Sequence, residues 1–325
     1  MPIDRRRLLA GAAALAPLAL ARPVAAQPFP SRPIRILVPV PPGGSLDLLS
    51  RTLAKVLPAR LDQPVVVENH AGAGGNIAFG LAAQAPADGH TLLHGWDPLV
   101  INPPLYGKVP YRLDQFAPIT LAVTSGQVLV THPGRVPATD FGGFAALAAA
   151  RPGALTIGTP GSGSPGHLAM SLLETSTGLK FVHVPYKGGG PAIADLLAGH
   201  LDAAFVTLPA ALAHVRADRL RAIGLSSPRR STGAPQIPTF QEGGVRGYEL
   251  DSWQGFFAPA GTPVDAIGRL NREIVAALTE PALREQLVGQ GFEVVGSPPQ
   301  RLAQELTAGA DRWAELVKSS GARVD

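Results

Sequence analysis

The sequence predicts an α/β protein with two lobes, and three observations lead to this fold class. Short apolar runs that end in glycine-rich loops alternate with helix patterns along the chain. Such alternation is typical of parallel strands joined by crossover helices. The series occurs twice, once before residue 117 and once between residues 141 and 225. About 300 residues follow a leader-like N-terminus, which is enough for two domains with their own cores.

The first 26 residues are set aside because they match an export signal. Arg5-Arg6-Arg7 precedes the uncharged apolar stretch 8–21, and Val24-Ala25-Ala26 forms a small-residue cleavage site. The apolar stretch is shorter than the roughly 20 residues that a membrane span needs. We therefore expect cleavage after Ala26 and a periplasmic mature protein that begins at Gln27. The paired arginines also fit twin-arginine export, so both Sec and twin-arginine routes stay open.

Removal of this segment takes away most of the positive charge. Residues 1–26 contain four arginines and one aspartate, so the formal net charge falls from +4 to +1. The rest of the chain has no stripe of Lys and Arg with interleaved aromatic residues, and we expect no nucleic-acid partner. The sequence contains no cysteine, which excludes disulfides and thiolate chemistry.

The first series begins with the apolar run 34–40, which stops at Pro41-Pro42-Gly43-Gly44. A helix follows, with Ser45 as the predicted N-cap. The helical spacing of apolar residues predicts one buried face, formed by Leu46, Leu49, Leu53 and Val56. The later elements of this series are predicted as a strand at 64–68, a helix at 77–85 and a strand at 91–95.

The second series is reached through residues 117–131, which are apolar and rich in β-branched side chains. Thr124-Ser125-Gly126 interrupts this run, so we predict two strands around a crossing between the lobes. The elements that follow are predicted as helices at 141–150 and 167–177, a short helix closed by Gly199, and strands at 155–158, 180–184, 203–207 and 220–225.

The C-terminal part of the chain starts with the Pro-, Ser- and Gly-rich stretch 226–247, which predicts an irregular surface connection. A strand resumes at residue 252. Thr262 is the predicted N-cap of a helix that begins at Pro263. Three helices with charged outer faces are predicted at 264–278, 281–290 and 299–319.

Four glycine-rich loops lie between a strand and a helix. They comprise residues 41–44, 72–76, 161–166 and 188–190. The first N–H groups of a helix have no intrahelical partner, and the helix dipole adds positive charge there, so such a loop can hold an anion. One loop of this kind would indicate only a tight turn. Four loops, two in each series, share the carboxyl edges of the sheets, and we predict an anion-binding cleft lined by backbone donors.

No catalytic or nucleotide-binding motif accompanies these loops. Gly161-x-Gly163-x-x-Gly166 has the spacing of the dinucleotide fingerprint, but no Asp or Glu follows the strand at 180–184, so we reject this assignment. Neither a Walker A loop nor a nucleophile elbow is present. The residues therefore indicate binding without a cofactor or metal, and an exported α/β enzyme acting on a small carboxylate is the alternative.

Six segments together carry a more specific resemblance. They are "PIRILVPVPPGGSLDLLSRTLA", "QPVVVENHAGAGGNIA", "ADGHTLL", "GSGSPGHLA", "VHVPYKGGGPAIADLLAGHLD" and "APAGTP". In this order they resemble the Bug family, the TctC-like periplasmic solute-binding receptors of tripartite tricarboxylate transporters. The resemblance implies two Rossmann-like lobes joined by two crossing segments, as in type II periplasmic binding proteins of the Venus flytrap kind. It places lobe 1 at residues 27–122 plus 253–325 and lobe 2 at 123–252.

The resemblance also implies a function. A monomeric, non-enzymatic receptor is expected to close on one small carboxylate and to deliver it to permease subunits or to a sensor. The family's range includes tricarboxylates, dicarboxylates, acidic amino acids and aromatic carboxylates, so the ligand stays open. Many relatives have an Asp-Asn pair where this chain has Val206-Thr207, which implies a less polar surrounding for the distal end of the ligand.

The family pattern implies a set of ligand-binding residues. Backbone amides, small hydroxyls and water are expected to hold the carboxylate. The first-lobe contacts implied are Gly43, Gly44 and Ser45, with Asn76 and Trp96 completing that wall, and the second-lobe contacts are Ser162, Gly163, Ser164 and His167, with Tyr186 and Thr207 deeper in the pocket. Asp47 either complements the helix dipole or contacts a polar ligand group or water. His167 contacts ligand or only satisfies backbone, and Lys187 adds positive potential or is merely solvated.

Overall fold

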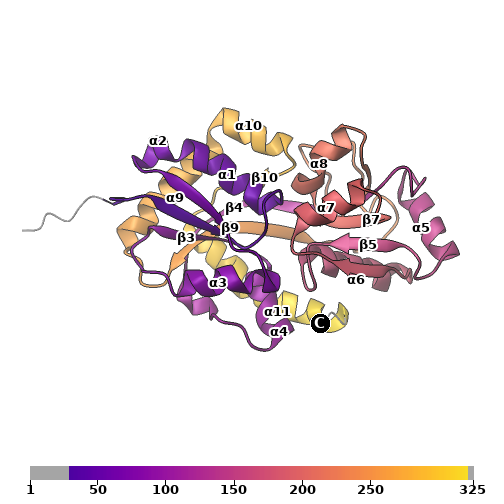
Figure 1. Cartoon of the computed structure of the whole chain (residues 1–325), viewed down its shortest axis with the longest axis horizontal. Helices are drawn as coiled ribbons and strands as arrows, with labels where there is room; N and C mark the ends of the chain where they lie inside the picture. The colour runs from indigo at the N-terminus through magenta and orange to yellow at the C-terminus, as the bar shows by residue number, and fades with distance from the viewer. Residues whose placement is uncertain (1–28, 321–325) are drawn as a thin grey trace, which may run out of the picture.

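The computed structural model describes residues 29–320, so the predicted export signal lies outside the described residues. One continuous sheet path runs through the molecule in the order β2-β1-β3-β9-β4-β7-β5-β6, and β8 and β10 also pair with β4. The strands are β1 (Ile34–Val38), β2 (Val65–Asn69), β3 (Thr91–Trp96), β4 (Phe116–Thr131), β5 (Thr156–Thr159), β6 (Val182–Pro185), β7 (Ala203–Thr207), β8 (Arg221–Leu225), β9 (Asp251–Pro259) and β10 (Glu293–Val294). Figure 1 shows β4 and β9 running along the long axis between two groups of helices and strands.

Strand direction follows the two predicted series only in part. β1 is parallel to β2 and β3, and β5 is parallel to β6 and β7, as expected. The crossing strands make the whole sheet mixed, because β9 is antiparallel to β3 and β4, and β4 is antiparallel to β7 and β8. β4 carries the chain from the first series to the second and β9 carries it back, so the two paired strands run in opposite directions.

The predicted break at Thr124-Ser125-Gly126 is also wrong. β4 is one strand of 16 residues, and these three residues pair with Trp253, Ser252 and Asp251 of β9. Glycine weakens a strand, but pairing of all three residues with β9 keeps this segment extended. The pairing shifts register between Pro118 and Thr120 and again between Leu121 and Val123. The boundaries of the two lobes stay a prediction.

The helices agree with the sequence patterns where those patterns are apolar and periodic. They are α1 (Ser45–Val56), α2 (Pro58–Leu61), α3 (Asn76–Ala83), α4 (Pro98–Tyr106), α5 (Phe141–Ala150), α6 (Pro165–Thr177), α7 (Gly189–Leu197), α8 (Leu208–Arg216), α9 (Val264–Thr279), α10 (Pro281–Gly289) and α11 (Pro299–Ser320). The sequence did not predict α2, α4 or α8. α4 and α8 carry proline in their first turn, where its missing N–H has no intrahelical partner to lose.

Two predicted N-caps are displaced by one residue. Gly44, with extended backbone angles, is the N-cap of α1, and Ser45 is its first residue. Pro263 is the N-cap of α9, while the Thr262 hydroxyl donates to the carbonyl of Pro259. The apolar face of α1 is as predicted, because Leu46, Leu49 and Leu53 are buried and Val56 packs against the same core.

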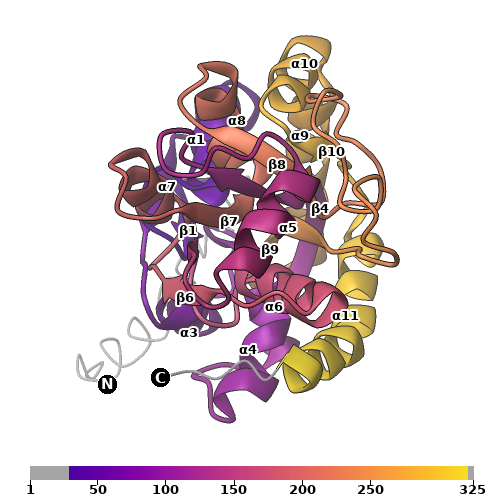
Figure 2. The same ribbon diagram turned by 90° about the vertical axis from the view of Figure 1, so that its right-hand side faces the viewer.

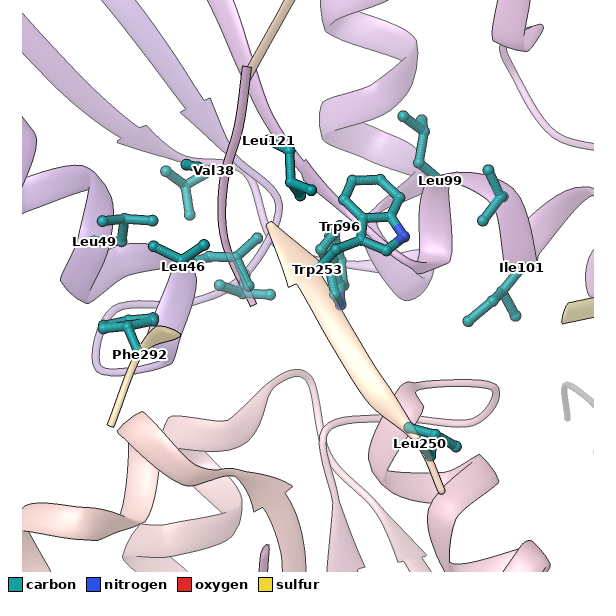
Figure 3. Close-up of a cluster of buried hydrophobic side chains, with 14 of the residues drawn as sticks. Val38, Leu46, Leu49, Trp96, Leu99, Ile101, Leu121, Leu250, Trp253 and Phe292 are labelled. Atoms are coloured by element: carbon teal, nitrogen blue, oxygen red, sulfur yellow. The ribbon is translucent and has the colours of Figure 1, made fainter. Parts of the chain in front are cut away.

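The hydrophobic core extends along the crossing strands. Trp96 of β3, Trp253 of β9 and Leu121 of β4 belong to one buried cluster, and Figure 3 labels all three side chains in the region of β9. α11 contacts both α4 and α6, and the three helices lie together in the lower part of Figure 2. The C-terminal helix therefore packs against elements of both series. No helix within residues 29–320 is long and apolar enough to cross a membrane.

Candidate functional site

Two adjoining cavities lie where the glycine loops of the two series meet. The outer cavity has a volume of about 260 Å³ and the inner one about 30 Å³. They share Val40, Trp96 and Pro160. The outer cavity is lined further by Pro39, Gly72, Ala73, Gly74, Gly75, Pro98, Asn102, Tyr106, Gly161, Ser162, Gly163, Ser164, Pro185, Tyr186 and Lys187. The inner cavity is lined further by Gly44, Ser45, Leu46, Gln127, Pro165, Gly189, Thr207 and Ser252.

Eight of the twelve residues implied by the resemblance line these cavities. They are Gly44, Ser45, Trp96, Ser162, Gly163, Ser164, Tyr186 and Thr207. The other four, Gly43, Asp47, Asn76 and His167, are not lining residues, and each of them holds a neighbouring part of the wall through hydrogen bonds. The structure thus separates residues that face the cavity from residues that position them.

Asp47 holds the loop that precedes α1. Its carboxylate accepts hydrogen bonds from the backbone N–H of Gly43 (3.1 Å), from Asn69 Nδ2 (2.9 Å) and from Arg51 Nε (2.9 Å). Burial by itself would raise the pKa of Asp47, but the hydrogen bonds from Arg51, Asn69 and Gly43 outweigh it and hold the pKa below its usual value. The charged carboxylate fixes Gly43, whose φ of +93° suits glycine. This contact arranges the loop and leaves the start of α1 directed at the inner cavity.

Ser45 is oriented by the returning crossing strand. Gln254 of β9 donates through Nε2 to Ser45 Oγ at 2.9 Å. Because the serine oxygen accepts this bond, its own hydrogen is available to another acceptor. Ser45 is buried and lines the inner cavity, so a cavity occupant can receive that hydrogen bond.

Asn76 and Trp96 support the first-series wall in different ways. Trp96 lines both cavities and packs beside Phe79, with ring centroids 5.5 Å apart. The amide oxygen of Asn76 accepts from Asn102 Nδ2 at 2.8 Å, and Asn102 also donates to the carbonyl of Gly74 at 3.0 Å. Asn76 therefore ties the glycine loop at 72–75 to α4, and Asn102 is the amide that reaches the outer cavity.

The second-series wall is built at the start of α6. Ser164 is the N-cap, and its Oγ accepts from the backbone N–H of His167. Gly163, at φ +73°, donates its N–H to His167 Nδ1 at 3.0 Å. The proton of the neutral ring is therefore on Nε2. The ring stacks on His183 with centroids 3.9 Å apart, and burial followed by the charge of His183 lowers the pKa of His167 to about 4.

Tyr186 and Thr207 lie at different depths. Tyr186 lines the outer cavity, and its hydroxyl donates to Asp195 Oδ2 at 2.7 Å. Burial and this bond raise the pKa of Tyr186 to about 12, so its hydroxyl is protonated at neutral pH. Thr207 is the N-cap of α8 and lines the inner cavity. Its place opposite Gln127 in the β4–β7 ladder puts both side chains at the same level of the sheet.

The charge of the site comes mainly from backbone dipoles. Lys187 is exposed and is the one charged side chain among the described residues that line the two cavities. Four helices begin at the inner cavity, because Gly44, Pro165, Gly189 and Thr207 line it at the starts of α1, α6, α7 and α8. Helix starts carry partial positive charge and unpaired N–H groups, so this arrangement favours an anion. Within residues 29–320, no cluster of three or more His, Asp or Glu side chains could hold a metal ion.

The loops of the two series are in contact across the site. A Cβ placed on Gly188 would lie 2.9 Å from Pro41 Cδ, and one on Gly190 would lie 2.9 Å from the carbonyl oxygen of Pro42. On the other side, a Cβ on Gly163 would lie 1.9 Å from Leu105 Cδ2. Glycine at these positions allows the two walls to approach closely.

Sequence reasoning missed Gln127, Asn102 and Tyr106. Asn102 and Tyr106 belong to α4, a helix that the sequence patterns did not predict because it contains Pro103 and Pro104. Gln127 lies just after the triplet that was predicted to break β4. A signal for it exists, since Gln127 is the one long polar side chain in the run 117–131.

Comparisons with known proteins agree with this geometry. Residues 49–322 match the family described as "Tripartite tricarboxylate transporter family receptor". The chain is 38% identical to Protein BugT of Bordetella pertussis over 95% of this chain and 96% of that protein. It is also 38% identical to a UPF0065 protein from the tcbD-tcbE intergenic region of Pseudomonas sp. strain P51, over 97% and 94% of the two chains.

Solved structures of proteins from the same family have the same fold. A protein of R. palustris solved with adipate has a TM-score of 0.87 and 32% identity, and the match covers 91% of this chain and 99% of that one. MatC from Rhodopseudomonas palustris, solved with bound malate, has a TM-score of 0.83 and 30% identity over 89% and 100% of the two chains. The periplasmic binding protein BugD has a TM-score of 0.86 and 30% identity over 91% and 99%.

Fold and site together define a solute-binding protein of the periplasmic type. The chain belongs to the receptor family of tripartite tricarboxylate transporters, the TctC or Bug family, whose members are non-enzymatic periplasmic binding receptors. The predicted family, fold class and absence of enzymatic activity are confirmed by these likenesses. The alternative of an exported enzyme is wrong.

Proposed function

We propose that this receptor captures one small carboxylate between its two lobes and delivers it to the permease subunits of a tripartite tricarboxylate transporter. The observation that carries the proposal is the convergence of four helix starts on the inner cavity. Charge from helix dipoles and N–H groups suits a carboxylate and needs no arginine. Relatives that are 30–32% identical were solved with malate and adipate, which are small carboxylates.

The lobes proposed are residues 27–122 plus 253–325 and residues 123–252, connected through β4 and β9. The close contacts of Pro41 with Gly188 and of Leu105 with Gly163 support a cleft that closes around its ligand. A cavity of about 260 Å³ lies just below the usual range for ligand pockets, so we expect a small molecule. We further propose that the mature protein is a periplasmic monomer released from its signal peptide at Gln27.

The proposed roles of the site residues follow their positions. Residues that line the cavities contact the ligand directly or through water, and the carboxylate rests between the start of α1 and the start of α6. Gly43, Asp47, Asn76 and His167 act as positioning residues, because their polar atoms already bond to other parts of the wall. Lys187 adds positive potential at the rim of the outer cavity.

Ligand-induced stabilisation tests the proposal. The exported protein would be heated with acetate, propionate, succinate, malate, adipate and citrate, and with the matched neutral amides, such as propionamide and succinamide. A ligand at 100 times its Kd stabilises the folded state by about 2.7 kcal/mol. We expect at least one carboxylate to raise Tm by a few degrees. If the amides shift Tm as much as the carboxylates, or if no carboxylate does, the proposal is wrong.

A further inference from the structure

Gln127 is a buried side chain whose amide has no partner in the protein. It is 1% exposed, and neither Nε2 nor Oε1 forms a hydrogen bond with any described residue. The residue lies in β4, opposite Thr207, and lines the inner cavity. A buried polar group without a partner destabilises the fold, so an unpaired amide at a binding site indicates a bound partner.

Each of the other amides around the site donates to another group of the protein. Asn102 donates to Asn76 and Gly74, Asn69 donates to Asp47, and Gln254 donates to Ser45 through Nε2, so that of Gln254 only Oε1 has no partner. Gln127 therefore differs from its neighbours in offering both its donor and its acceptor to the cavity. An amide presents these two functions side by side, so its complement is a group that accepts at one atom and donates at an adjacent one.

The other groups that line the inner cavity indicate which kind of ligand group can pair with the Gln127 amide. Helix starts and the Ser45 hydroxyl supply donors, which suit the oxygens of a carboxylate. An unsubstituted carboxylate accepts but cannot donate, so it would leave Gln127 Oε1 unpaired. A hydroxyl on the carbon beside the carboxylate would donate to this oxygen. An ammonium group would donate too, but the described cavity lining has no acidic side chain to balance its charge.

We propose that Gln127 is a specificity-determining residue of this receptor. Its Nε2 donates to the bound carboxylate, and its Oε1 accepts from a hydroxyl on the adjacent carbon. The receptor thus prefers 2-hydroxy carboxylates to their unsubstituted counterparts. The inference rests on the proposed function, since it assigns a ligand class to the same site.

Matched ligand pairs test this assignment. Calorimetric titration would compare lactate with propionate, malate with succinate, and 2-hydroxyadipate with adipate. We expect the hydroxylated member of a bound pair to bind about tenfold more tightly, the effect of one net hydrogen bond. Gln127→Met keeps the length of the side chain but removes both polar functions, and should bring the ratio within a pair close to one. Gln241→Met, at an exposed position, is the matched control and should keep the wild-type ratio.

A stability measurement separates recognition from a structural role. Because the amide of Gln127 bonds to no described residue, Gln127→Met should be at least as stable as wild type without ligand. A variant that is less stable and binds both members of a pair equally weakly would overturn the inference. Equal binding of both members by wild type would overturn it too, since water would then satisfy the amide. If no carboxylate of any pair binds, the proposed function itself fails, which is a different outcome.

Discussion

Replacing Gly44 by aspartate would put a fixed carboxylate where the ligand carboxylate is proposed to lie. Gly44 is the N-cap of α1 and lines the inner cavity. Its φ of −84° and ψ of 170° are open to any residue, and an added Cβ would meet Val40 Cγ2 at an ordinary 3.8 Å. Aspartate is also a favoured N-cap. The fold should therefore accept the change, while the site should not.

The expected loss of affinity follows from the charges. Two carboxylates about 4 Å apart repel by about 4 kcal/mol at an effective dielectric constant of about 20. This corresponds to a roughly 1,000-fold rise in Kd. The new side chain would also accept from N–H groups at the start of α1 that the ligand is proposed to use, which adds to the loss. Both effects come from the charge and capping oxygen of the side chain rather than from its volume.

Gly44→Asn is the matched control because it has nearly the same shape and the same capping ability without the charge. Kd would be measured by calorimetry for the carboxylate that gives the largest thermal shift, and folding by denaturant unfolding. We expect the asparagine variant to bind within about tenfold of wild type, and both variants to unfold cooperatively. An aspartate variant that binds as tightly as the asparagine variant would show that the ligand carboxylate lies away from the start of α1.

Three further predictions test other parts of the molecule. N-terminal sequencing of the periplasmic protein should begin at Gln27, and a mature chain that retains residues before Ala26 would contradict the cleavage site. Gly163→Ala forces an alanine to φ +73° and its Cβ against Leu105, so it should disfavour the closed cleft and weaken binding by at least tenfold. Leu105→Ala in the same chain should recover much of that loss, and no recovery would refute the contact as its cause. Burial lowers the pKa of His167 from 6.5 to about 4, so the unfolded chain binds more protons between these pH values. The free energy of unfolding should then fall as pH drops from 6.5 to 4, by roughly 3 kcal/mol at most, and a His167→Asn variant with an unchanged slope in denaturant titrations would contradict this origin.

Local sequence patterns were sufficient for the elements that begin and end at glycine or proline. The start of α1 could be predicted because an apolar strand stops at Pro41-Pro42-Gly43-Gly44 and an amphipathic pattern follows. The same holds for α6 and α7, and the convergence of their starts follows from parallel pairing within each series. What sequence could not give is how the two series face each other. The approach of Leu105 to Gly163 depends on α4, which was not predicted, and on the closeness of two walls far apart in the chain.

The crossing strands show why local composition wrongly predicted a break in β4 beside the inner cavity. Thr124-Ser125-Gly126 has the composition of a turn, yet these three residues pair with β9. The residues just beyond them pair with β7 and β8, so β4 stays extended through both halves. Continuity of β4 brings Gln127 to the inner cavity beside Thr207. A break in the strand would have freed the chain to turn away there. β4 contributes Gln127 to the lining of the inner cavity, and β9 contributes Gln254, which bonds to the lining residue Ser45. A ligand held by Gln127 and Ser45 would therefore interact with both strands that link the two series. Binding specificity and closure of the cleft would then depend on the same strands, so a change at Gln127 should alter ligand choice and the extent of closure together.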